Sequence, residues 1–233
     1  MRSIPTAQLL RVSVVLTGLI AQPPASLAQE QMGTVGNAPV FRVWTYVTGP
    51  LDLADRDTAE QIAQDLLGTA GITVDWRHCD RAGTCSLEDV APPSVTLILM
   101  SAVRPTCGTA ALAPAVKAAT VLVSVPCVEE VVFKLQRRVS TRTHPRVSTL
   151  KRRHLLGAAI AHELGHVLGL PHASTGLMRA RLEIGDIVAL MQGTLTFSGA
   201  EVERMRTSAM WEAPVLTPTA IVDARDKAMT ARP

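Results

Sequence analysis

Aromatic residues are scarce in this sequence. Phenylalanine, tryptophan and tyrosine together make up 3% of its 233 residues, and Tyr46 is the only tyrosine. Apolar residues as a whole still reach 47%, which is enough for a packed core and argues against a disordered chain. The core must therefore consist mainly of aliphatic side chains and methionine. The length is enough for one domain of ordinary size or for two very small ones.

A strong net charge is also missing. The formal charge is +3, and removing Arg2 and Arg11 with the N-terminal segment would leave about +1, since no acidic residue precedes Glu30. One stretch, residues 134–153, is nevertheless basic. We interpret it as a solvated loop and the start of a helix, with an anionic partner surface or a processing site as alternatives. It contains no interleaved aromatic residues, so the sequence does not favour a nucleic-acid partner. The basic residues are Lys134, Arg137, Arg138, Arg142, Arg146, Lys151, Arg152 and Arg153.

No segment approaches the roughly 20 apolar residues that span a bilayer. The N-terminus has a shorter apolar stretch at residues 12–20, two prolines after it, and small residues at Ser26 and Ala28. This pattern predicts a signal peptide over residues 1–28, with a short membrane anchor as the alternative. Residues 29–39 then form a flexible leader. We expect an exported protein, secreted or periplasmic, without stable membrane insertion once the signal is removed.

Cysteine is sparse, and none follows Cys127. An even number of cysteines in an exported chain predicts two disulfides. Sequence proximity favours the pairs Cys79–Cys85 and Cys107–Cys127, although four cysteines allow three pairings and buried thiols are possible. A zinc site of four thiolates is disfavoured, because such sites normally contain cysteines two to four residues apart.

Hydrophobic periodicity predicts a mixed α+β domain. Strands are expected at residues 41–47, 72–76, 95–100 and 120–125, and a helix at residues 55–67. Residues 77–93 are expected to form a loop. A long helix is predicted over residues 147–168, and its second half is apolar on most sides and should be buried.

The buried half of that helix carries two histidines and a glutamate, which need polar partners there. His162 and His166 are four residues apart and project from the same helix face, with Glu163 offset around the axis. Gly169 can end the helix in a left-handed conformation. The chain then turns and brings His172 back as a third ligand.

Three neutral histidines and one water form the open tetrahedral zinc site of hydrolytic enzymes. Zinc lowers the pKa of its bound water to about 7, and Glu163 is positioned to act as the catalytic base. The competing interpretation is an apolar helix whose core histidines only make hydrogen bonds. The sequence thus predicts one catalytic Zn²⁺ held by His162, His166 and His172.

The run HELGHVLGLPH, residues 162–172, resembles the HExxHxxGxxH motif of the metzincin zinc metallopeptidases. It looks most like the matrixin branch and its bacterial members. The resemblance implies an α+β zincin-like fold: a mixed twisted β-sheet, a long zinc-binding helix, a methionine turn and a C-terminal helix. It would cover residues 40–212, followed by a tail at 213–233. Met178 fits the methionine turn, with Met191 as the second candidate.

The resemblance also implies a substrate site. In metzincins a peptide lies along an edge strand, which should fall between residues 107 and 125 here, and residues 173–197 would wall the main specificity pocket. The capping box of Ser198 and Glu201 would start the final helix. The other histidines match nothing in the motif and are interpreted as surface residues: His78, His144 and His154.

Some features of the family are missing from this sequence. No tyrosine follows Met178 as an extra ligand, no cysteine lies in the leader to form a cysteine switch, and no upstream set of histidines and aspartates matches the structural metal sites of matrixins. We therefore expect a monomeric secreted zinc endopeptidase acting on peptide or protein substrates. A non-catalytic metal-binding or interaction module is the alternative. A further alternative is another zinc hydrolase family with Glu183 as third ligand.

Overall fold

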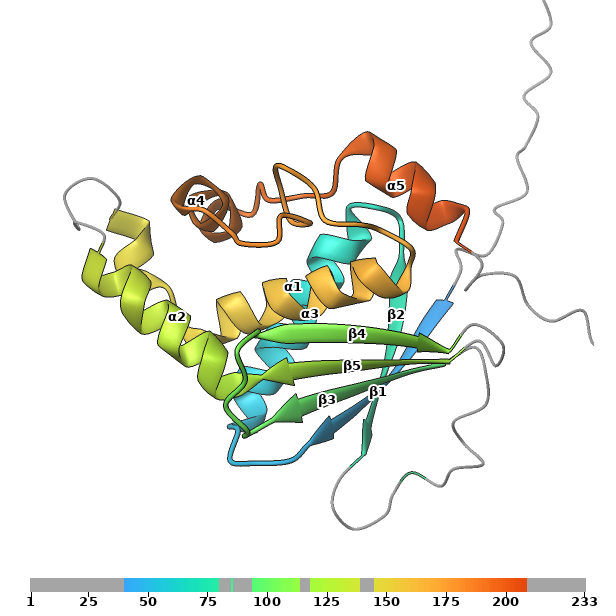
Figure 1. Ribbon diagram of the computed structural model, residues 1–233, viewed down its shortest axis with the longest axis horizontal. Helices are drawn as coiled ribbons and strands as arrows, with labels where there is room; N and C mark the ends of the chain where they lie inside the picture. The colour runs from blue at the N-terminus through green and yellow to red at the C-terminus, as the bar shows by residue number, and fades with distance from the viewer. Residues whose placement is uncertain (1–39, 80–84, 86–93, 114–117, 139–144, 209–233) are drawn as a thin grey trace, which may run out of the picture. The chain divides into compact units, whose positions relative to one another are not determined.

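The computed structural model describes residues 40–79, 85, 94–113, 118–138 and 145–208 (Figure 1). The predicted signal peptide, the leader and the tail lie outside these residues, as does His144. Within the described residues, no helix is both long and apolar enough to cross a membrane.

Five strands form one mixed β-sheet. They are β1 (Val40–Val47), β2 (Thr73–Cys79), β3 (Ser94–Met100), β4 (Gly108–Ala113) and β5 (Ala118–Ser124), in the spatial order β2-β1-β3-β5-β4. Four of them run parallel, and β4 pairs antiparallel with β5. This architecture confirms the mixed α+β prediction, and β4 is the edge strand expected between residues 107 and 125.

One face of the sheet is buried at its central strands. On β3, Val95, Leu97 and Leu99 have no solvent exposure, whereas the residues between them are partly exposed. Alternation of this kind follows from the two-residue repeat of a strand. The helices α1 (Leu53–Gly68) and α3 (Arg152–Val167) lie against each other, and α3 also contacts β4 and β5 (Figure 1).

A glycine allows the close approach of α1 and α3. A Cβ atom added at Gly157 would lie 2.7 Å from the carbonyl oxygen of Ala59 and 2.7 Å from the Cβ of Ile62. Any side chain at this position would push the helices apart. The close contact therefore fixes α3, the helix that carries HELGH, against the first helix of the domain.

The predicted helix over residues 147–168 is wrong at its start. Residues Pro145–Thr149 form a separate 3-10 helix, and Lys151 is extended with φ −116° and ψ 161°. The hydroxyls of Ser148 and Thr149 donate to the carbonyls of Pro145 and Arg146 at 2.6 and 2.8 Å. Such local bonds compete with the helical pattern, so α3 begins only at Arg152. Its end agrees with the prediction, since Gly169 has φ +86°.

Two helices were not predicted, α2 (Val125–Arg138) and α4 (Ile184–Gln192). The start of the basic stretch, expected as a loop, is thus the end of α2. The final helix α5 (Gly199–Arg206) was predicted: the hydroxyl of Ser198 accepts from the backbone nitrogen of Glu201 at 3.3 Å, and the carboxylate of Glu201 accepts from that of Ser198 at 2.6 Å.

Two disulfides join Cys79 to Cys85 and Cys107 to Cys127. This is the pairing that sequence proximity favoured, and it leaves no free cysteine. Cys79 is the last residue of β2, whereas Cys107 precedes β4 and Cys127 lies in the first turn of α2. Each bridge therefore fixes one end of a strand.

Candidate metal centre

Three imidazole rings converge at the C-terminal part of α3. The Nε2 atom of His166 lies 3.1 Å from the Nε2 of His162 and 3.2 Å from the Nε2 of His172. One ligand atom from each ring lies within 4.8 Å of the others. The structure thus brings together the three residues that the sequence singled out, two from the helix and one from the chain after the Gly169 turn.

The far nitrogens of two rings are held by backbone carbonyls. The Nδ1 of His162 lies 2.8 Å from the oxygen of Leu177, and the Nδ1 of His166 lies 2.7 Å from that of Leu170. A carbonyl oxygen only accepts, so each Nδ1 carries the proton and donates it. In the neutral rings both Nε2 atoms are then acceptors that face each other across 3.1 Å.

Two facing acceptors require a positive charge between them. A shared proton is disfavoured, because burial lowers the pKa of His162; the hydrogen bond to Leu177 partly opposes this, and the nearby His166 and His172 lower the pKa further. A metal ion satisfies both nitrogens. Tetrahedral zinc with nitrogen ligands at 2.0–2.1 Å places those ligands about 3.3 Å apart, close to the observed separations. The donor set and its spacing therefore fit zinc, and the carbonyls provide the outer hydrogen bonds that orient such ligands.

Glu163 lies beside this group without joining it. Its residue surface is only 7% exposed, and burial raises the pKa of its carboxyl to about 7. The start of β4 passes directly over the carboxylate: a Cβ added at Gly108 would lie 2.2 Å from Oε1. Gly108 was not identified from the sequence. The position of Gly108 matters through a contact between residues far apart in the chain. The sequence indicated only that an edge strand should fall between residues 107 and 125.

Met178 is fully buried against α3, the helix that carries HELGH. Its Sδ atom occupies the space that a side chain at Gly165 would fill, 2.6 Å from the Cβ position. The backbone of Ala173 donates to the carbonyl of Met178 at 2.8 Å and closes the loop that also supplies the Leu177 carbonyl. Met191 lies on α4 and is partly buried. The assignment of Met178 to a methionine turn stays a prediction.

The alternative third ligand lies elsewhere. Glu183 precedes α4, its side chain is 73% exposed, and its carboxylate pairs with Arg179 at 2.6 Å. Among the described residues, the histidine group contains His172 and not Glu183. The geometry therefore favours the all-histidine ligand set.

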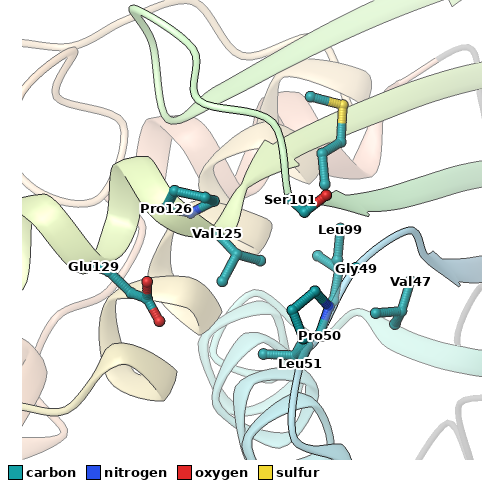
Figure 2. Close-up of a pocket in the computed structure, with 10 residues that line it drawn as sticks. Val47, Gly49, Pro50, Leu51, Leu99, Ser101, Val125, Pro126 and Glu129 are labelled. Atoms are coloured by element: carbon teal, nitrogen blue, oxygen red, sulfur yellow. The ribbon is translucent and has the colours of Figure 1, made fainter.

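A small cavity lies apart from these residues. It measures about 150 Å³ and lies between the ends of β1 and β3 and the start of α2, with Leu51, Val125 and Glu129 in its lining (Figure 2). None of the three histidines lines it, nor does Glu163. The candidate centre is thus a partly exposed site at the edge of the sheet rather than this cavity.

Comparison with known proteins gives little beyond general likeness. The sequence matches no protein-family model and no curated protein. Among solved structures it is similar to metalloproteinase-II from Bacteroides fragilis, with 16% identity and a TM-score of 0.45 over 73% of this chain and 53% of that one. It is also similar to archaemetzincin from Methanopyrus kandleri, with 14% identity and a TM-score of 0.40 over 74% of this chain and 97% of that one.

The chain spans about half the length of the Bacteroides protein. Likeness at this level assigns neither a family nor an activity to the chain. The resemblance to the matrixin branch stays a prediction.

Proposed function

We propose that this chain is an exported zinc-dependent endopeptidase of metzincin type. The observation that carries the proposal is the convergence of three imidazole nitrogens beside a buried carboxylate that is not part of their group. A purely structural zinc site is usually closed by four protein ligands. Here the described residues offer three, and the position of Glu163 suits a base next to an open coordination position.

His162, His166 and His172 would hold the ion. When bound, zinc supplies a Lewis acid that polarises a carbonyl and makes water more acidic. Glu163 accepts a proton from the attacking water while the water oxygen bonds to the scissile carbon. Glu163 then returns that proton to the amine when the C–N bond breaks. A general acid–base works best when its pKa lies near the operating pH, and in the metal-free protein burial raises the pKa of Glu163 to about 7.

The substrate class follows from the strand beside Glu163. β4 pairs with β5 on one side and is the last strand of the sheet on the other, and most of its residues are exposed. An extended peptide can add to such an edge through backbone hydrogen bonds. Because Gly108 begins β4 and contacts the Glu163 carboxylate, a peptide paired there would pass close to the catalytic base.

Export is supported by the two disulfides, which form and persist in oxidising compartments. The predicted signal peptide agrees with this location.

Residues 173–197 would contribute the wall of the specificity pocket.

The test is cleavage of a peptide library by purified wild-type protein and by the Glu163→Gln variant. We expect zinc-dependent cleavage by the wild type and none by Glu163→Gln. Both proteins should contain the same amount of zinc bound to the three histidines. Glu130→Gln, an exposed glutamate on α2 outside the group, is the matched control and should cleave like the wild type. If the wild-type protein binds this zinc but cleaves no peptide, the peptidase proposal is rejected and the non-catalytic metal-binding module is supported.

A further inference from the structure

A second group of potential metal ligands lies outside the histidine site. Asp57 and Glu60 come from α1, and His78 comes from β2. One ligand atom from each residue lies within 4.8 Å of the others. The two acidic residues are three positions apart on the helix and therefore share a face. The sequence did not reveal this group, because the fold brings His78 to α1 from 18 residues further along the chain.

Glu60 is the unusual member of this group. It is only 4% exposed, and its Oε2 lies 2.7 Å from the Nε2 of His78. Its other oxygen, Oε1, is buried without a hydrogen-bond partner among the residues that the structure describes. Burying a carboxylate oxygen without a partner is costly, and a bound ion is one established explanation for such an atom.

The group is open to solvent on one side and fixed on the other. The side chains of His78 and Asp57 are 41% and 59% exposed, so an ion can reach them. The Cys79–Cys85 disulfide begins at the residue after His78 and restrains the end of β2. On β1, Thr45 is the register partner of His78, and the pairing of β2 with β1 along its whole length holds the histidine in place.

We propose that Asp57, Glu60 and His78 form a second site for a divalent transition-metal ion, zinc being the best fit. One imidazole nitrogen and two carboxylate oxygens are donors that zinc accepts together in proteins. The ion would bond to the unpartnered oxygen of Glu60 or to both oxygens. Asp57 also pairs with Arg56 through Oδ1 at 2.6 Å, which leaves its second oxygen for the ion.

A bound ion would link α1 to β2. Since α1 packs along α3, the site would stabilise the region that supports the zinc-motif helix. This role is structural and does not depend on peptidase activity. The competing interpretation is a simple hydrogen bond between Glu60 and His78.

The test counts bound zinc. Full-length protein is stripped with a chelator, dialysed against buffered Zn²⁺, and analysed for metal per chain. We expect two ions in the wild type, one in His172→Ala, one in His78→Ala and one in Asp57→Asn. Asp65→Asn, a matched exposed aspartate on the same helix, should keep two. The double variant Asp57→Asn/His172→Ala should bind none.

Thermal unfolding provides the second measurement. Zinc should raise the melting temperature of His172→Ala, which keeps only the new site, because a ligand of the native state stabilises it. It should not raise that of Asp57→Asn/His172→Ala. One ion in the wild type that is lost only by His172→Ala would overturn the second site and leave the proposed peptidase intact. Two ions that both survive in His78→Ala and Asp57→Asn would also overturn it.

Discussion

The backbone at Gly108 lies directly against the carboxylate of Glu163, so that an added Cβ would be 2.2 Å from Oε1 and 2.6 Å from Cδ. Glu163 is on α3 and Gly108 begins β4, the edge strand. The contact therefore relates the proposed base to the strand along which a peptide would bind. The Cys107–Cys127 disulfide fixes the residue just before Gly108.

Gly108→Ala should reduce peptide cleavage without loss of zinc. The new methyl group forces either Glu163 or β4 to move, and a displacement of about 1 Å in an active site can cost on the order of 100-fold in rate. The measurement is kcat/KM together with metal content. Gly199→Ala is the control, because a Cβ there meets no described atom within 4 Å. Unchanged kcat/KM in Gly108→Ala would mean that this contact does not position the base.

Glu163→Gln should stabilise the metal-free protein at alkaline pH. Burial raises the folded-state pKa of Glu163 from 4.5 to about 7, so its carboxyl costs no stability below pH 4.5, and the folded state loses stability as the pH rises from 4.5 through 7. Glutamine keeps the shape and stays neutral. A shift of this size corresponds to roughly 3 kcal/mol, which sets the upper limit of the gain.

Urea unfolding with chelator present measures this effect. At pH 8 the free energy of unfolding of Glu163→Gln should exceed that of the wild type, and at pH 4.5 the two should be similar. Equal stabilities at pH 8 would show that the carboxyl is not buried as the structure has it.

Asp55→Asn should weaken the connection between the starts of α1 and α3. The hydrogen bond from Arg152, at 2.7 Å, lowers the pKa of Asp55, burial partly opposes this, and Arg153 adds a longer contact at 3.4 Å. A carboxyl with a lowered folded-state pKa stabilises the fold above its ordinary value near 3.8 and loses that contribution as pH falls through the folded value.

We therefore expect Asp55→Asn to lower the free energy of unfolding of metal-free protein by about 1 kcal/mol at pH 7. The difference should shrink as the pH is lowered below 3.8. Asp65→Asn, whose carboxylate contacts only the neutral Gln61 in the described residues, serves as control. The same loss at pH 7 and at pH 2.5 would contradict an ionic origin.

The convergence of the three histidines could be predicted because its geometry is local. The four-residue spacing of His162 and His166 fixes their common face, and Gly169 fixes the turn that returns His172. All of this lies within residues 162–172. Four of the five strands were predicted for a similar reason, since the continuous apolar run at residues 95–100 and the alternation at residues 41–47 are local patterns.

The parts that were missed depend on tertiary contacts or on abrupt changes of structure. The helix α2 starts immediately after β5, at Val125, with no turn residue to mark the boundary. The supporting atoms of the site are the carbonyls of Leu170 and Leu177, and backbone groups leave no signature in side-chain identity. The pairing of Glu60 with His78 likewise appears only once α1 lies beside β2.

The most direct test of the metal centre is anomalous diffraction at the zinc absorption edge from a crystal of the zinc-loaded protein. The account predicts a peak bonded to the Nε2 atoms of His162, His166 and His172 at about 2.0–2.1 Å, with no fourth protein side chain attached. A peak that excludes His172, or one closed by a further ligand such as Glu183, would contradict it.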